Sequence, residues 1–214
     1  NELALKYKKQ EAIQLVAGMY SDFYRRIGDM DNAHKNTQLS YNIAEILNQE
    51  LISFGAYVRM AESYYYRNQI DSTFHYLDKI TTLTDQLGIP FMVLLSNYYS
   101  GRYSYYNGDH KKSIKHFDFI IENIPPDFDL SMRVIPKAFN ALNHHAIGQS
   151  EESDGYIDLI QEELKEGSKF KEMEYYHVMV NAFLVNNKTD AAKQYILDAY
   201  DIIMEQSFRI KDRA

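Results

Sequence analysis

The sequence predicts an all-α protein, an α-solenoid of about five helix pairs, from two observations. A short polar turn recurs along the 214 residues, and only Gly or Asn stands at one position of it: Gly28, Asn68, Gly108, Gly148 and Asn187. The steps between these positions are 40, 40, 40 and 39 residues, and Gly and Asn most readily adopt the left-handed conformation that closes a helix. Five residues later a small side chain follows each time, where a second helix would pack closely on the first: Ala33, Thr73, Ser113, Ser153 and Ala192. A fixed period of this kind indicates stacked helix-turn-helix repeats.

Between the turns, apolar residues fall mostly at steps of three and four, which is the helical signature. In the first helix, expected over about 11–27, they are Ile13, Leu15, Val16, Met19, Tyr20, Phe23 and Tyr24. Residues 1–10 are charged and are expected to form a lead-in or the end of a preceding helix. We predict one continuous domain over 1–214 with repeats at about 11–48, 51–87, 91–124, 131–166 and 171–206.

Gly and Pro residues mark the repeat boundaries. Gly88 suits a helix exit and Pro90 the first turn of the next helix, and the pair Pro125 and Pro126 cannot continue a helix. Pro136 conflicts with a helix starting near 131, so that helix either begins later, near Val134, or is kinked. The last helix, 189–206, carries a stripe that includes Tyr195, Ile196, Ala199, Tyr200 and Ile203, widened by further apolar residues. Such a helix is expected to contact a further repeat, a capping helix or a partner.

The composition is that of a folded protein, with 45% hydrophobic and 25% charged residues. A formal net charge of −7 argues against binding nucleic acid, which needs clustered Lys and Arg. The absence of Cys excludes disulfides and thiolate metal sites and fits the cytoplasm or the bacterial periplasm equally well.

No membrane span is expected, because no apolar run approaches the roughly 18 residues that a transmembrane helix needs. The chain begins without Met and stops in a polar run, so we expect a fragment of a longer protein.

No pattern of catalytic or ligand residues stands out. His144 and His145 are neighbours on one helix and point about 100° apart, so they cannot chelate a metal together, even with His177 nearby. The run that starts at Asp29 has Ala33 where a calcium loop needs a ligand. There is no nucleophile elbow and no Gly-rich phosphate loop. The sequence therefore predicts no enzyme, no metal and no cofactor.

A second spacing links the two helices of each pair. Twelve residues before each small residue of the second helix stand Ser21, Ala61, Gly101, Ala141 and Val180. An aromatic residue follows three positions later at Tyr24, Tyr64 and Phe183, and the second helices carry Thr37, Leu77, Phe117, Ile157 and Ile196 four after the small residue. This pattern resembles tetratricopeptide repeats, although the period of about 40 exceeds their 34 residues and the family's Trp is absent. Long repeats of this sort resemble the sensor or scaffold regions of bacterial regulators.

The resemblance implies a right-handed α-α superhelix whose first helices line a concave, peptide-binding face. By helical geometry, thirteen residues lean toward that groove: Asp22, Arg25, Arg26, Glu62, Tyr65, Tyr66, Tyr98, Arg102, Tyr105, Tyr106, His145, His177 and Asn181. Tyr and Arg carry much of the energy of protein interfaces, so this groove would suit a peptide with some acidic character. The competing interpretation is that Tyr at helical spacing is core packing.

Two functions follow as hypotheses. The first is a non-catalytic scaffold that binds a protein or peptide on the concave face. The second is a sensory or dimerisation region of a bacterial signalling protein or transcriptional regulator, whose helix-turn-helix or histidine-kinase output domain lies outside the chain. In either case the apolar last helix could form a homodimer.

Overall fold

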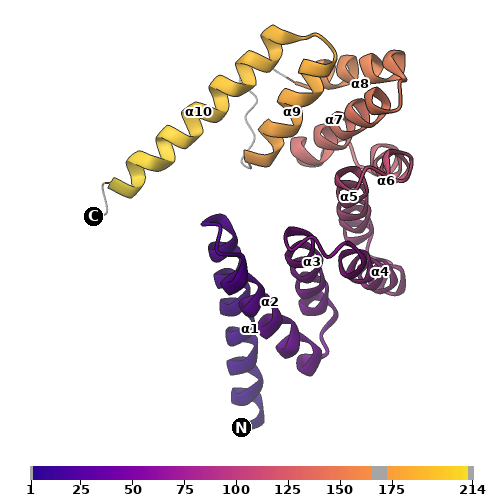
Figure 1. The fold of residues 1–214 in the computed structure, drawn as a ribbon. Helices are drawn as coiled ribbons and strands as arrows, with labels where there is room; N and C mark the ends of the chain where they lie inside the picture. Colours follow the sequence, from indigo (N-terminus) through magenta and orange to yellow (C-terminus); the bar gives the residue numbers. More distant parts are fainter. Residues whose placement is uncertain (1, 165–172, 212–214) are drawn as a thin grey trace. The chain divides into compact units, whose positions relative to one another are not determined.

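The computed structural model describes residues 2–164 and 173–211, with side chains over 6–164 and 175–204, and these residues form helices and no strand (Figure 1). They divide into two compact units, Asn1–Ser100 and Gly101–Ala214, with the boundary inside α5. The N-terminal unit holds α1 (Glu2–Arg26), α2 (Met30–Leu47), α3 (Glu50–Tyr66), α4 (Ile70–Leu87) and the first part of α5 (Pro90–Tyr106). The C-terminal unit continues with α6 (His110–Asn123), α7 (Leu130–Ala146), α8 (Ser150–Glu163), α9 (Met173–Val185) and α10 (Thr189–Lys211). The predicted all-α fold of helix pairs is confirmed, and the single continuous domain stays a prediction.

All five predicted turns have the expected left-handed residue. The φ angle is positive at Gly28, Asn68, Gly108, Gly148 and Asn187. In the first turn the amide of Gly28 donates to the carbonyl of Arg25 at 3.1 Å, and the amide of Asp29 donates to Tyr24 at 2.9 Å. These bonds satisfy the last carbonyls of α1, while the Asp29 side chain accepts from the Asn32 amide and caps α2. One short segment thus ends the first helix and starts the second.

The conformations of two glycines predict opposite effects of the same substitution. Gly108 has a φ of 79°, so Gly108→Ala should lower the free energy of unfolding by about 1–2 kcal/mol. Gly155 lies within α8 with no atom near its would-be Cβ, so Gly155→Ala should raise it by about 0.5–1 kcal/mol through helix propensity. Urea denaturation followed by circular dichroism measures both, and equal shifts of the same sign would contradict this reading of the turn.

The spacing of twelve residues corresponds to direct contacts between the paired helices. In the third pair the Ser113 hydroxyl donates to the carbonyl of Gly101 at 2.9 Å. In the fourth pair the Ser153 hydroxyl donates to the carbonyl of Ala141 at 2.7 Å. A Cβ at Gly101 would lie 3.1 Å from the ring of Phe117, so a small residue at this position lets α6 approach α5 closely.

Two helix boundaries differ from the prediction. Because α1 begins at Glu2 rather than near residue 11, residues 2–10 continue the first helix instead of leading into it. The later start of α7, near Val134, is also wrong, since α7 begins at Leu130 and includes Pro136. Asp129 caps α7 by accepting from the Ser131 amide at 2.9 Å, which starts the helix ahead of the proline. The predicted start of the fifth pair at 171 and the break at 166–168 lie outside the described residues.

Most of the large apolar residues of α1 face away from the packed partner helix. The buried face of α1 carries Gln14, Ala17 and Ser21, whereas Ile13, Val16 and Tyr20 are exposed. In α10, Tyr195 is buried but Ile196, Tyr200 and Ile203 of the predicted stripe are exposed, so its contact with a further repeat, a capping helix or a partner stays a prediction. The physical reason is the same in both cases. Helical spacing identifies an apolar face, but only a neighbouring helix buries it.

Candidate functional site

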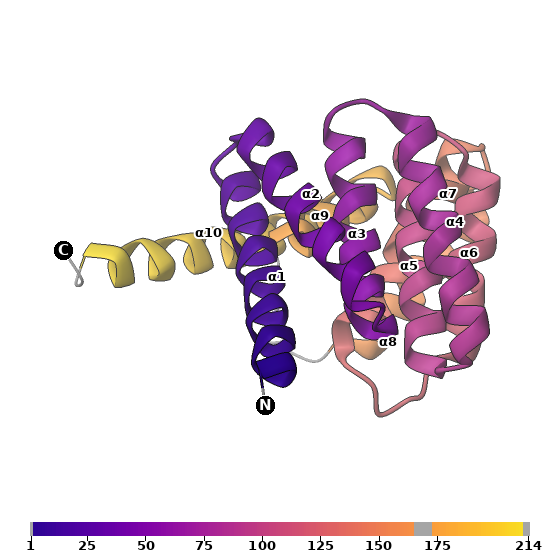
Figure 2. The same ribbon diagram turned by 90° about the horizontal axis from the view of Figure 1, so that it is seen from below.

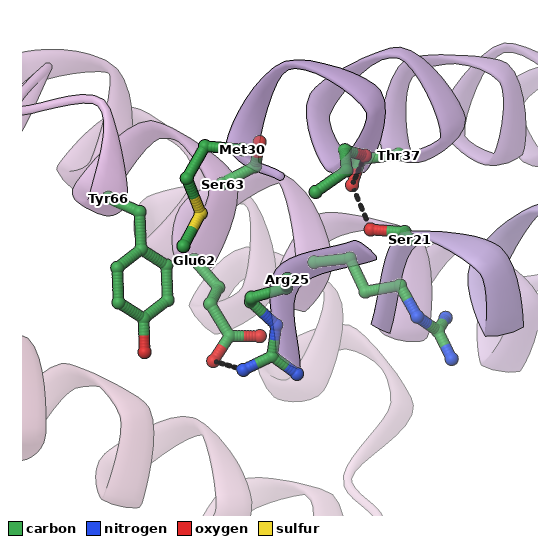
Figure 3. A pocket seen from close by; sticks show the side chains of 9 residues that line it. Ser21, Arg25, Met30, Thr37, Glu62, Ser63 and Tyr66 are labelled. Atoms are coloured by element: carbon green, nitrogen blue, oxygen red, sulfur yellow. Dashed lines mark hydrogen bonds and ion pairs between the residues drawn. The ribbon is translucent and has the colours of Figure 1, made fainter. Parts of the chain in front are cut away.

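The predicted groove residues nearest the N-terminus gather on two first helices. Asp22, Arg25 and Arg26 lie in the last two turns of α1, and Glu62, Tyr65 and Tyr66 lie at the end of α3. These helix ends are joined by side-chain contacts, which makes them the part of the predicted groove that the structure assembles most clearly (Figure 3).

Four charged side chains form a ladder between α1 and α3. Arg25 Nη1 donates to Glu62 Oε1 at 2.8 Å, and Arg25 Nη2 donates to Asp22 Oδ1 at 3.3 Å. Arg59 Nε lies 3.6 Å from the other oxygen of Asp22. We call these four residues, Asp22, Arg25, Arg59 and Glu62, the charge ladder. Its two cations and two anions satisfy one another, so its net charge is zero.

Three members of the charge ladder, Arg25, Arg59 and Glu62, line a small cavity. Its wall also includes Ser21, Thr37 and Tyr66 (Figure 3). The cavity has a volume of about 10 Å³, which is room for about one water molecule. The Ser21 and Thr37 hydroxyls lie 2.5 Å apart and link α1 to α2 behind it. Burial opposes the charge of Arg25, but Glu62 and Asp22 outweigh it and raise the pKa of Arg25. Arg25 is therefore held charged at the base of the site.

Tyr66 lines the cavity and is exposed, and Arg26 directly follows Arg25 in the chain. Both side chains are exposed, and among the described residues Arg26 has no ion pair or hydrogen bond. The ring of Tyr66 lies 5.7 Å from that of Tyr65, which is half-buried. An incoming acidic group could thus bind Arg26 without breaking an existing ion pair.

Sequence reasoning missed Arg59, although a signal for it was present. Arg59, Glu62 and Tyr66 follow one another at steps of three and four on α3, which places them on one face of the helix. The groove residues on α3 were predicted at fixed distances in sequence from Ala61, and Arg59 does not stand at one of these distances.

Two predicted groove residues are buried. Tyr98 and Arg102 expose 6% and 8% of their surface, so the expectation that they point outward is wrong. The Arg102 guanidinium carbon lies 5.4 Å from the ring centre of Tyr103 and 5.8 Å from that of Tyr106. Stacking on aromatic rings stabilises a cation and holds it inside the protein.

Tyr105 and the three polar residues of the later repeats complete the predicted set. Tyr105 is half-buried, with ring centres 5.2 Å from Phe139 and 5.7 Å from His110, and burial raises its pKa. It therefore packs against its neighbours, as the competing interpretation predicted for such tyrosines. His145 and His177 are exposed, and the Asn181 amide nitrogen lies 3.1 Å from Nε2 of His177.

Within the described ranges, no three His, Asp or Glu side chains gather as metal ligands. None of the helices described is both long and apolar enough to cross a membrane.

We predict that the folded protein loses stability in mild acid because of His116 in α6. Burial and then the nearby Lys112 lower the pKa of His116, with Asp109 opposing them. Below its ordinary pKa of about 6.5, the unfolded chain binds a proton that the folded chain resists, so stability falls as the pH drops through that value. Burial and Arg67 act on His34 in the same direction.

Thermal unfolding between pH 7.5 and 5.5 should therefore show a falling midpoint, and His116→Gln should flatten the slope. His177→Gln, which removes an exposed histidine, is the control. An equal slope in the parent and in His116→Gln would contradict the prediction.

The fold can be compared with known proteins. No protein-family model and no curated protein matches the chain. It is similar to the solved structure of the nearly identical TPR-like repeats assigned to a kinesin light chain of Podosopora anserina, with 14% identity and a TM-score of 0.64. That match covers 94% of this chain and 97% of the other. The solved structure of a point variant of that protein also matches, with 13% identity and a TM-score of 0.65. This match covers the same fractions of the two chains. The chain therefore has the tetratricopeptide-like helical-repeat fold that its sequence resemblance predicted.

Proposed function

We propose that the chain is a non-catalytic interaction module that binds a peptide segment at the ends of α1 and α3. The fold supports a protein-interaction scaffold in general, since tetratricopeptide-like repeats present extended binding surfaces. The observation that carries the finer proposal is the charge ladder with the exposed Tyr66 beside it; the exposed Arg26 follows Arg25 of the ladder in the chain.

The chemistry of this surface narrows the ligand. The charge ladder is internally neutral, so it fixes the two helix ends and does not itself attract an acidic partner. Arg26 adds a cation that has no ion-pair partner among the described residues, and Tyr66 adds a broad, partly apolar ring. A peptide that carries an acidic side chain next to an aromatic or aliphatic one would contact both groups.

Selection of random 12-residue peptides on the parent chain, followed by fluorescence anisotropy, tests this proposal. The double variant Arg26→Ala/Tyr66→Ala removes two exposed side chains and should weaken the selected peptides at least about tenfold, which is about 1.4 kcal/mol. Lys193→Ala/Tyr200→Ala is the matched control, because it removes one cation and one exposed tyrosine from α10. Added salt should weaken binding to the parent. Failure to enrich any peptide, or equal affinity for both variants, would overturn the proposal.

Fewer observations support the second candidate function, a sensory or dimerisation region of a signalling protein. Exposed Ile196, Tyr200 and Ile203 on α10 agree with the predicted homodimer through the last helix. No feature of the structure favours a bacterial regulator or sensor, so that role stays a prediction.

A further inference from the structure

The outward face of α1 is unusually apolar for a helix at the edge of its unit. Five exposed residues follow one another at steps of three, four, three and four, and we call them the N-terminal stripe: Ile13, Val16, Tyr20, Phe23 and Ile27. The face that packs on α2 is polar or small instead, with Gln14 and Ser21 hydrogen-bonded to Ser40 and Thr37. In both views α1 forms an outer edge of the N-terminal unit (Figures 1 and 2). The larger apolar side chains thus point away from the helices that α1 contacts.

Helix α2 also exposes two large apolar residues. Leu39 and Ile46 are exposed and seven residues apart, which places them on one face of the helix. They lie on the other side of α2 from Tyr41 and Glu45, which contact α4 and α3 through Lys79 and Tyr57. Helix α2 therefore also exposes apolar groups on a side that faces away from α3 and α4.

The apolar surface of the stripe approaches the size that an interface needs. With roughly 100 Å² exposed on each half-covered large side chain, the five residues of the N-terminal stripe present about 500 Å². That lies in the upper part of the range for the largest apolar patch of a monomer and is more than half of the roughly 800 Å² that each partner contributes to a stable complex.

We propose that a second copy of this chain covers the N-terminal stripe through antiparallel packing of α1 on α1. The alternating steps of three and four residues are the spacing of helices that pack side by side. The inference rests on other residues than the charge ladder, because Arg25 lies on the opposite side of α1, where it contacts Glu62 of α3.

The charged residues near the stripe favour an antiparallel over a parallel arrangement of the two α1 helices. Lys6 and Lys9 are exposed and continue the spacing of the stripe toward the N-terminus. In a parallel pair, Lys9 would meet Lys9 of the partner subunit, and like charges repel. In an antiparallel pair, Ile13 meets Phe23 of the partner subunit, Val16 meets the partner's Tyr20, and Lys9 approaches the turn that carries the partner's Asp29. The antiparallel direction thus keeps Lys9 of each chain away from Lys9 of the partner subunit.

Sedimentation velocity of the full chain over a range of concentrations tests the assembly. We expect a species of twice the 25.1 kDa chain mass at micromolar concentration. Val16→Glu/Phe23→Glu should weaken it at least about 100-fold, since each charge enters the symmetric contact twice. Tyr200→Glu/Ile203→Glu puts the same charges on exposed positions of α10 and should leave the dimer intact. A monomer at all concentrations, or a dimer lost only with the α10 variant, would overturn the proposal.

Cysteine cross-linking tests the direction, because the chain has no Cys of its own. A mixture of Ile13→Cys and Phe23→Cys chains should form a mixed disulfide under mild oxidation, since an antiparallel contact brings these positions together. Efficient disulfide formation by Ile13→Cys alone would indicate a parallel pair and would overturn the arrangement.

Discussion

Phe117→Ala should lower the free energy of unfolding of the C-terminal unit by about 3–5 kcal/mol, as for other fully buried aromatic residues. Phe117 has no exposed surface, and its ring is stacked on Phe139 with centres 4.7 Å apart. Gly101 lies against the ring of Phe117, and it has no side chain that could move into the space left when the ring is removed. The cavity therefore cannot collapse easily, and the lost stacking adds to the cost.

Guanidinium denaturation followed by circular dichroism measures this loss, and Phe119→Ala on the same helix is its control. Phe119 is partly exposed and should cost about 1 kcal/mol. Because helical repeats can unfold in parts, hydrogen exchange of the α6 amides would show whether the loss occurs around this ring. Equal losses for the two variants would mean that Phe117 does not anchor the core.

The features that the sequence predicted well depend on local chemistry. A left-handed residue is needed wherever a first helix ends and turns back, so Gly28 and Asn68 could be identified from residue type and spacing alone. The contact between Ser113 and Gly101 follows from the same regular spacing, because a small residue on each helix permits close approach. Phe117 belongs to this group, since its position four residues after Ser113 predicted a core aromatic.

The features that it predicted poorly depend on which neighbours a residue meets. The spacing of Ile13 and Val16 indicates a helix face but not whether a further helix covers that face. Arg102 was assigned to the groove by its direction on the helix, yet the rings of Tyr103 and Tyr106 hold it inside. Arg59 joined the charge ladder because Asp22 lies opposite it on another helix, and only the tertiary structure shows that juxtaposition.

Glu163→Gln should lower the free energy of unfolding by about 2–3 kcal/mol, the second large effect, because it breaks a largely buried charge cluster between α7 and α8. Arg133 Nη1 donates to Glu163 Oε2 at 2.8 Å, and the Lys137 ammonium donates to the other oxygen. Lys137 is 8% exposed, and burial together with Arg133 lowers its pKa. Without Glu163 two neighbouring cations remain with no carboxylate between them. Breaking a fully buried pair costs about 3–5 kcal/mol, and partial exposure of Arg133 and Glu163 reduces the expected loss.

A rescue variant separates lost pairing from lost packing at this cluster. Adding Lys137→Met to Glu163→Gln should recover most of the loss, because it removes the buried charge and keeps a side chain of similar length. Glu162→Gln, at the exposed neighbouring position, should leave the unfolding midpoint near that of the parent. If the double variant is less stable than Glu163→Gln alone, the contribution of Glu163 lies in its packing rather than in balancing the charge of Lys137.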